Sequence, residues 1–156
     1  MHSRVHICFV CTGNICRSPM AEIVFTEALR DAGLADRVRV SSAGTGDWHV
    51  GSPADPRTET TLRRAGYDVA HVAAQVGPQH LSADLLVALD RGHLAALRRL
   101  VPDRDRLVLL RSFDESADAD MDVPDPYFGG RHGFDDVLQM VQAAVPGLLA
   151  WVRERL

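Results

Sequence analysis

A polar segment near the amino terminus combines residue types that could carry out nucleophilic chemistry on a phosphate. It runs from Cys11 to Ser18 with the sequence CTGNICRS and follows directly on an apolar run. If a strand ends at Cys11 and a helix begins after the segment, the backbone between them can turn its N–H groups toward one centre and bind an oxyanion. Gly13 permits the torsions of such a turn, and Arg17 can place two guanidinium N–H groups on the bound oxygens.

Cys11 is the predicted nucleophile of this loop. The amide dipoles and the guanidinium that bind an anion also favour a thiolate over a thiol. Ser18 can cap the helix and donate a hydrogen bond to the sulfur, which helps the sulfur to leave when a phosphocysteine breaks down. A merely buried cysteine would leave its Gly, Asn, Arg and Ser neighbours unexplained. The remaining positions of the predicted phosphate-binding loop are Thr12, Gly13, Asn14, Ile15 and Cys16.

The other two cysteines have different interpretations. Cys8 lies in the middle of the apolar run, between Ile7 and Phe9, and is assigned to the core. Two hypotheses stay open for Cys16: simple packing, or a reversible disulfide that protects Cys11 from over-oxidation. A zinc site is not expected, because residues three apart on a strand point to opposite faces and no histidine follows at ligand spacing. We predict neither a metal nor a cofactor.

The elements that must position this loop are predicted from hydrophobic patterning. Apolar runs indicate buried strands at Val5–Val10, Val38–Ser42, Leu85–Leu89 and Leu107–Leu110. Because the runs alternate with longer stretches, the pattern is typical of an α/β fold with a parallel sheet. A chain of 156 residues, of which 46% are hydrophobic, is enough for one domain spanning residues 1–156.

Two helices are predicted, with a long irregular segment before the second. The first begins at Pro19, which a first helical turn tolerates, and ends at Gly33. Its apolar face is predicted to consist of Met20, Ile23, Val24 and Ala28. The stripe of the last helix is predicted to consist of Val137, Val141, Ala144, Leu148 and Val152. Pro146 and Gly147 should kink or split that helix. The segment Ser112–Gly133 has no period and is expected to be a functional loop.

Composition argues against several classes of partner. The net charge is -4, and the 17 basic residues are spread along the chain, so nucleic acid is not an expected partner. No apolar run approaches the roughly 20 residues of a membrane helix, and no export signal is recognisable. All three cysteines lie too close together to staple distant parts of a fold. We therefore expect a cytoplasmic protein that does not bind membranes, acting as a monomer.

The segment FVCTGNICRSPMAE resembles the signature of the low-molecular-weight protein tyrosine phosphatases, and in particular the actinobacterial members of that family. The similarity continues through SSAGTGDWHVG, HVAAQV, LLVALD and DPYFGG to the last helix. It implies a four-stranded parallel sheet flanked by helices, with the phosphate-binding loop between the first strand and the first helix. The active site would lie at the carboxyl ends of the strands, as is general for open α/β sheets.

The resemblance also implies roles for residues far from the loop. Asp125, in the DP pair, would protonate the leaving oxygen, and Asn14, Ser42 and His71 would hold the loop in its strained shape. Chemistry requires such an acid, because expelling a phenoxide needs a proton and the phosphoenzyme then needs an activated water. One carboxyl group can serve both steps.

Aromatic residues point to the substrate class. Trp48, Tyr127 and Phe128 would form the walls of a slot of phenyl depth, which favours phosphotyrosine in proteins over the shorter phosphoserine. The last two would also reduce the solvation of Asp125. An alternative is a protein arginine phosphatase of the same fold, which typically has threonine at the position of Ile15.

Two further alternatives are less favoured. An arsenate reductase needs cysteines downstream of Cys16, and this chain has none. A domain that binds phosphotyrosine without hydrolysing it would be expected to have a damaged centre, whereas Cys11, Arg17 and Asp125 are all intact. The sequence therefore favours a cysteine-dependent tyrosine phosphatase.

Overall fold

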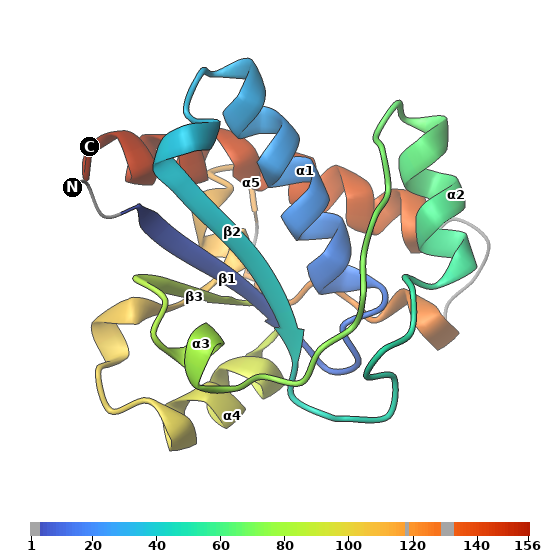
Figure 1. Ribbon diagram of the computed structural model, residues 1–156, viewed down its shortest axis with the longest axis horizontal. Helices are drawn as coiled ribbons and strands as arrows, with labels where there is room; N and C mark the ends of the chain where they lie inside the picture. Colours follow the sequence, from blue (N-terminus) through green and yellow to red (C-terminus); the bar gives the residue numbers. More distant parts are fainter. Residues whose placement is uncertain (1–3, 118, 129–132) are drawn as a thin grey trace.

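A parallel sheet with helices on both faces organises the computed structural model, which describes residues 4–117, 119–128 and 133–156 (Figure 1). Its strands are β1 (Val5–Cys11), β2 (Val38–Gly44), β3 (Leu85–Ala88) and β4 (Leu107–Leu109). They lie in the order β2-β1-β3-β4, and every neighbouring pair is parallel. The predicted four-stranded parallel sheet is confirmed, and each strand ends within two residues of its predicted bound.

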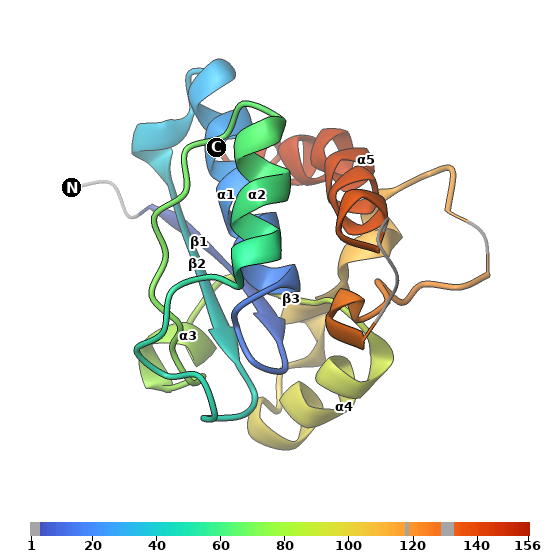
Figure 2. The same ribbon diagram turned by 90° about the vertical axis from the view of Figure 1, so that its right-hand side faces the viewer.

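Helices cover the sheet on both sides (Figure 2). The α-helices are α1 (Arg17–Asp31), α2 (Pro56–Arg64), α3 (Pro78–Leu81), α4 (Arg91–Leu100) and α5 (Gly133–Arg153). Short 3-10 helices are η1 (Ala35–Arg37), η2 (Arg104–Arg106), η3 (Leu110–Phe113) and η4 (Pro126–Phe128). α1 and α5 pack together on one face of the sheet, and α4 packs on the other. None of the helices in the described ranges has both the length and the hydropathy needed to cross a bilayer.

Strand β1 is buried on both faces, which explains its continuous apolar sequence. Ile7, Phe9 and Cys11 belong to the core beneath α1 and α5, whereas Cys8 and Val10 belong to the core beneath α4. The assignment of Cys8 to the core is confirmed. Cys8 and Cys11 also lie on opposite faces of the sheet, as expected for residues three apart.

Helix α1 begins two residues earlier than predicted, at Arg17. Pro19 therefore occupies the third position of the helix. It is tolerated there because the first four N–H groups of an α-helix have no partner within the helix. Of the predicted apolar face, Met20 and Val24 lie in the core, and Ile23 and Ala28 are half-buried and pack against it. The most deeply buried apolar residues of the helix are Met20, Ala21, Val24, Phe25 and Leu29.

Helix α5 is continuous across Pro146, so the predicted split is wrong. Pro146 is exposed, and its missing N–H leaves an unpaired carbonyl on the solvent side, where water can bind it. The five predicted stripe residues are all buried on either side of it, which holds the two halves against one core. Gly147 is required by packing, because a Cβ there would lie 2.3 Å from the carbonyl oxygen of Phe113.

The irregular segment before α5 crosses the carboxyl end of the sheet. Val123 is fully buried, and its N–H donates to the carbonyl oxygen of Leu89 (2.8 Å), just after β3. Asp122 accepts a hydrogen bond from the backbone N–H of Arg91, at the start of α4. Asp125 lies two residues after Val123, so these contacts place it at the same edge of the sheet as Cys11.

Candidate active site

In the loop between β1 and α1, five carbonyl groups accept hydrogen bonds from donors that surround the loop. The bonds, given as donor to carbonyl, are Thr45 N to Cys11 (2.8 Å), Gly46 N to Thr12 (3.0 Å), His71 Nε2 to Asn14 (2.6 Å), Asp55 N to Ile15 (2.9 Å) and Met20 N to Cys16 (3.3 Å). In a planar trans peptide, the C=O and the following N–H point in opposite directions. The N–H groups of the residues that follow these carbonyls therefore point toward the inside of the loop. This is the amide nest that the sequence predicted.

Two backbone positions make the tight loop possible. Gly44, at the end of β2, lies directly against the loop. A Cβ at this position would be 2.6 Å from the carbonyl oxygen of Thr12, so only glycine fits. Asn14 has a φ of 57° and is the only non-glycine residue of the described ranges with a positive φ. Asparagine tolerates this left-handed conformation better than most residues, although it still costs free energy, of order 1–2 kcal/mol.

The side chain of Asn14 holds this conformation in place. It is fully buried, and its Nδ2 donates to Ser18 Oγ (2.8 Å) and Ser42 Oγ (2.9 Å). Its Oδ1 accepts from the backbone N–H of Ala74 (2.9 Å). With the His71 bond to its carbonyl, Asn14 is tied to three other segments of the chain. The structure thus brings together the predicted supporting residues Asn14, Ser42 and His71.

Glu22 completes this support and was missed by the sequence analysis. Its Oε1 accepts a hydrogen bond from Ser42 Oγ and lies 4.0 Å from His71 Nδ1. Burial raises the pKa of Glu22, and the Ser42 hydrogen bond and the nearby His71 partly offset that rise. Glu22 is the last residue of the signature segment FVCTGNICRSPMAE, but its supporting role shows only once β2 packs beside the first helix.

Cys11 lies at the base of the loop, 3% exposed, with its Sγ 2.8 Å from Ser18 Oγ. Since Asn14 already donates to that hydroxyl oxygen, the hydroxyl hydrogen of Ser18 is available to the sulfur. The predicted contact is present, but the predicted capping by Ser18 is wrong. The residue at the N-cap of α1 is Cys16, which makes no side-chain cap, because the helix begins before Ser18.

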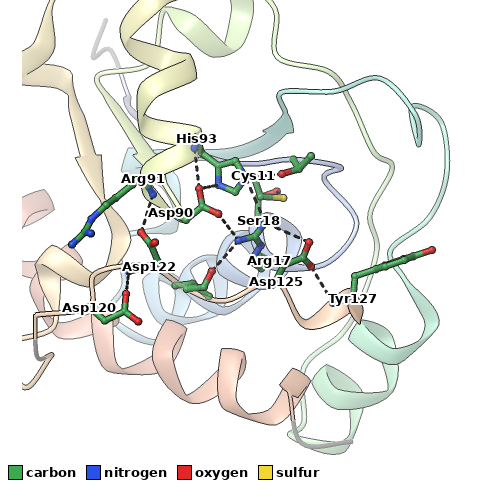
Figure 3. A network of polar contacts seen from close by, with 12 residues as sticks. Cys11, Arg17, Ser18, Asp90, Arg91, His93, Asp120, Asp122, Asp125 and Tyr127 are labelled. Carbon is green, nitrogen blue, oxygen red and sulfur yellow. Dashed lines mark hydrogen bonds and ion pairs between the residues drawn. The ribbon is translucent and has the colours of Figure 1, made fainter. Parts of the chain in front are cut away.

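Arg17 is held beside the loop by partners from two other segments (Figure 3). One terminal nitrogen, NH1, donates to Asp90 Oδ2 (2.8 Å) and to the carbonyl oxygen of Val123 (2.9 Å). The other, NH2, lies 3.9 Å from Asp125 Oδ2. Burial alone would raise the pKa of Asp90, but the hydrogen bonds from the backbone of His93 and from Arg17 hold it below its usual value.

His93 joins Arg17 to the loop. Its Nε2 lies 2.8 Å from Thr12 Oγ1 and 3.5 Å from Arg17 NH2, and its Nδ1 lies 3.2 Å from Asp90 Oδ1. Burial lowers the pKa of His93 to about 4, so the ring is neutral at pH 7. Because Arg17 can only donate, Nε2 acts as the acceptor and Nδ1 carries the hydrogen. Nδ1 lies beside the Asp90 carboxylate but is a buried atom that makes no hydrogen bond in the described part of the structure.

Asp90 and His93 were also missed. Asp90 immediately follows the predicted third strand, at the edge where the carboxyl ends of parallel strands meet, so its position could have identified it. His93 has no comparable signal. His49 is a further missed residue: it lines the pocket, and a Cβ added at Gly13 would lie 2.9 Å from its Cδ2.

A pocket opens above the sulfur. Its lining residues are Cys11, Thr12, Gly13, Ile15, Cys16, Arg17, Trp48, His49, Asp125 and Tyr127. Trp48 is 73% exposed, as suits a rim residue. Phe128, also predicted for the rim, has a side chain outside the described part of the structure.

The carboxyl group of Asp125 faces the pocket from the mouth. It is 43% exposed, and its Oδ1 accepts from the backbone N–H of Tyr127 (3.0 Å). The expectation that Tyr127 shields this group from water is wrong, because the Tyr127 side chain extends away from it toward solvent (Figure 3). The same expectation for Phe128 falls on a side chain outside the described part of the structure. A solvated carboxyl group can exchange protons with water between turnovers.

The three cysteines are free thiols. Burial raises the pKa of both Cys8 and Cys16 to about 12. Neither thiol therefore ionises near neutral pH. A disulfide between Cys11 and Cys16 under oxidation stays a prediction. Among the described residues, no group of three or more His, Cys, Asp or Glu side chains is arranged to hold a metal ion.

A thiol at the base of an anion-binding loop, with an arginine and a carboxyl group above it, is the arrangement of enzymes that transfer phosphoryl groups to cysteine. The family model described as low molecular weight phosphotyrosine protein phosphatase matches residues 6–156. The chain belongs to this family.

Relatives support the assignment over the whole length. The low molecular weight protein-tyrosine phosphatase A of Mycobacterium tuberculosis is 55% identical over 157 residues, covering 100% of this chain and 96% of that protein. The low molecular weight protein-tyrosine-phosphatase of Streptomyces coelicolor is 58% identical over 154 residues, covering 96% and 94%. The crystal structure of YfkJ from Bacillus subtilis superposes with a TM-score of 0.91 at 36% identity, covering 98% and 97%.

Proposed function

We propose that this chain, as a single phosphatase domain spanning residues 1–156, hydrolyses phosphotyrosine in proteins through a phosphocysteine at Cys11. The observation that carries the proposal is the position of the Cys11 sulfur at the base of an inward-facing set of amide groups. Those amides and Arg17 bind the phosphate oxygens and stabilise the charge that builds up in the transition state. The sulfur attacks phosphorus from below as the phenolic oxygen leaves toward the pocket mouth.

Asp125 acts at the opposite side of the phosphorus. In the first step it donates a proton to the leaving phenolic oxygen, and the Cys11–phosphorus bond forms as the oxygen–phosphorus bond breaks. In the second step the Asp125 carboxylate takes a proton from a water molecule, which attacks phosphorus and releases inorganic phosphate. Ser18 donates its hydrogen bond to the departing sulfur, which returns as a thiolate.

The rim accounts for the substrate class. Trp48 and Tyr127 are the aromatic residues of the described pocket lining, which also includes the nucleophile. A phenyl ring can reach the sulfur between such walls, whereas phosphoserine lacks the length and the stacking surface. Ile15 also lines the pocket, and its side chain has no hydroxyl that could handle water beside a guanidinium group. We therefore favour phosphotyrosine over phosphoarginine.

The partners that we propose are tyrosine-phosphorylated proteins, on which the chain acts as a monomer in a cytoplasmic setting. The free thiols of all three cysteines are consistent with a reducing compartment. The net charge of -4 gives no support to nucleic-acid binding.

The test is a kinetic comparison of three peptides that differ only in carrying phosphotyrosine, phosphoarginine or phosphoserine. We expect the highest kcat/KM with phosphotyrosine. A preference for phosphoarginine would favour the alternative arginine phosphatase, and equal values for all three would contradict the aromatic slot. A wild-type protein that binds phosphotyrosine but does not hydrolyse even para-nitrophenyl phosphate would leave only a binding domain.

A further inference from the structure

Arg57 connects two parts of the site without lining the pocket. It is the second residue of α2, and its side chain is 48% exposed. The described lining of the pocket includes Tyr127 and Asp125 but not Arg57. The guanidinium thus contacts a lining residue, Tyr127, without lining the pocket itself.

One side of Arg57 is bound to the N-cap of its own helix. Its backbone N–H and its Nε donate to Asp55 Oδ1 (2.8 and 3.1 Å), and its NH2 donates to Asp55 Oδ2 (3.0 Å). Burial would raise the pKa of Asp55, but these hydrogen bonds hold it below its usual value, so the pair is ionised at neutral pH. Asp55 in turn donates its backbone N–H to the carbonyl oxygen of Ile15 (2.9 Å). Arg57 is thereby anchored to the phosphate-binding loop.

The other side of Arg57 holds the segment that carries the acid. Its NH1 donates to the carbonyl oxygen of Tyr127 (3.2 Å), and its guanidinium lies over the Tyr127 ring, 5.1 Å from the centroid. It also lies over the ring of Phe134, in the first turn of α5, at 4.7 Å. Tyr127 is the residue whose N–H donates to the Asp125 carboxylate. A continuous chain of contacts thus runs from Ile15 through Asp55, Arg57 and Tyr127 to Asp125.

We propose that Arg57 is a positioning residue that fixes the Asp125 carboxyl group at the height of the leaving oxygen above the phosphate-binding loop. This inference rests on the proposed function, since it concerns proton delivery to the leaving group. General acid catalysis needs the carboxyl group within hydrogen-bond reach of one oxygen, so small displacements of the segment cost rate. Because one rigid guanidinium contacts both Asp55 and Tyr127, it fixes the position of the segment that carries Asp125 relative to the phosphate-binding loop.

The geometry requires arginine rather than any cation. The planar guanidinium makes two contacts with one carboxylate, donates a further hydrogen bond to a carbonyl oxygen and stacks on two rings at once. A lysine ammonium keeps the charge but offers neither the fork nor the flat face. Arg57→Lys is therefore expected to behave more like Arg57→Ala than like the wild type.

The experiment measures kcat/KM for a series of aryl phosphates with leaving groups of increasing basicity, from para-nitrophenyl phosphate to phosphotyrosine. kcat/KM is the suitable quantity because it covers the steps up to loss of the phenol. Weakly basic phenolates leave without much help, whereas the tyrosine phenolate, whose conjugate acid has a pKa of about 10, needs the proton. We expect Arg57→Ala to lower kcat/KM for phosphotyrosine by about tenfold or more, and for para-nitrophenyl phosphate by less than about threefold.

Three controls separate positioning from general damage. Arg63→Ala removes another exposed arginine of α2, whose ion-pair partner is Glu59 (3.9 Å), and should leave the whole series unchanged, because neither residue lines the pocket. Asp125→Asn should show a steeper dependence on leaving-group basicity than Arg57→Ala. In the double variant, Arg57→Ala should add almost nothing to Asp125→Asn, because a residue that acts through the acid has no effect once the acid is gone.

Several outcomes would overturn the inference. These are an unchanged leaving-group dependence in Arg57→Ala, an equal loss for every substrate, or full additivity in the double variant. If Arg57→Ala does not fold, Arg57→Lys is measured in its place under the same criteria. Failure of the proposed function is distinguishable, because the wild type itself would then hydrolyse none of the aryl phosphates or would prefer the phosphoarginine peptide in the comparison above.

Discussion

The phosphate-binding loop and the segment that carries Asp125 are built in opposite ways. The loop is supported from inside the protein: Asn14 is fully buried, and Ser42 is nearly so. The segment is held at the surface, where Asp125 is 43% exposed and its arginine anchor, Arg57, is 48% exposed. This difference in burial matches the different tasks of the two regions, which are anion binding and proton delivery. Anion binding needs dipoles that do not reorganise, whereas proton delivery needs a group that meets water between its two steps.

The largest effect is expected at the nucleophile. Cys11→Ser should lower kcat for para-nitrophenyl phosphate by at least about 10⁴-fold, because serine lacks an ionised nucleophile at neutral pH. Phosphate binding should survive, since the surrounding amides and Arg17 are unchanged. Steady-state kinetics and phosphate affinity by calorimetry measure the two quantities. A Cys11→Ser variant with substantial turnover would break the account of the loop.

The segment is tested next through Asp125. Asp125→Asn should lower kcat/KM for phosphotyrosine by about 10²–10³-fold, and should lower it much less for para-nitrophenyl phosphate, whose weakly basic phenolate leaves without much help from a proton. Glu115→Gln, an exposed carboxylate of the same irregular segment, is the matched control and should behave as wild type. An equal loss for both substrates in Asp125→Asn would mean that another group donates the proton.

The rigidity of the loop is tested by two substitutions of Asn14. Asn14→Ala removes its side-chain hydrogen bonds and places a poorly suited residue at a φ of 57°, whereas Asn14→Gly removes only the bonds. We expect both to lose about tenfold or more in kcat. Asn14→Ala should also be less stable than Asn14→Gly by roughly 1 kcal/mol. Equal stability in urea denaturation would show that the backbone at this position is not strained.

The prediction for His93 comes last because it concerns the pH dependence of stability rather than the rate of the reaction. Its pKa is about 4 in the folded protein, against 6.5 for the free side chain, so the unfolded chain takes up the proton first as the pH falls. The contribution of His93 to the free energy of unfolding is therefore complete above about pH 6.5. It falls by roughly 2–3 kcal/mol as the pH is lowered toward 4.

His93→Gln should flatten this pH dependence while keeping an acceptor for Thr12. The free energy of unfolding, measured in urea at pH 7 and pH 4.5, checks this in both proteins. Because His6 and His80 also have lowered pKa values, the comparison between variant and wild type is the informative quantity. An identical change in both proteins would contradict the role given to the His93 ring.

The same contrast explains how much the sequence could predict. The loop was predictable because its parts are contiguous: a strand end, a glycine, an arginine and a serine within a few positions. Asp125 could not be chosen among the acidic residues of its segment from composition, and was identified only through the family resemblance. The contacts of Glu22 and His93 depend on which helix packs beside which strand, and no local pattern encodes that.

Other errors have local causes. Pro19 was taken as the start of the first helix, but the first turn tolerates proline at several positions, so the start was placed two residues late. Pro146 was taken as a break, but burial on both sides of it outweighs the loss of one hydrogen bond. Arg57 carries no motif at all, and its role is visible only when Ile15 and Tyr127 are seen on either side of it.

The central claim is that the sulfur of Cys11 receives the phosphoryl group. Trapping the phosphocysteine intermediate tests this most directly. The protein is mixed with a phosphorylated aryl substrate, quenched in acid within milliseconds, digested and analysed by mass spectrometry. We predict one phosphoryl group on the peptide that contains Cys11, formed in a burst as the phenol is released. A quenched sample with phenol released but no phosphoryl group on that peptide, or with the group on another residue, would contradict the account.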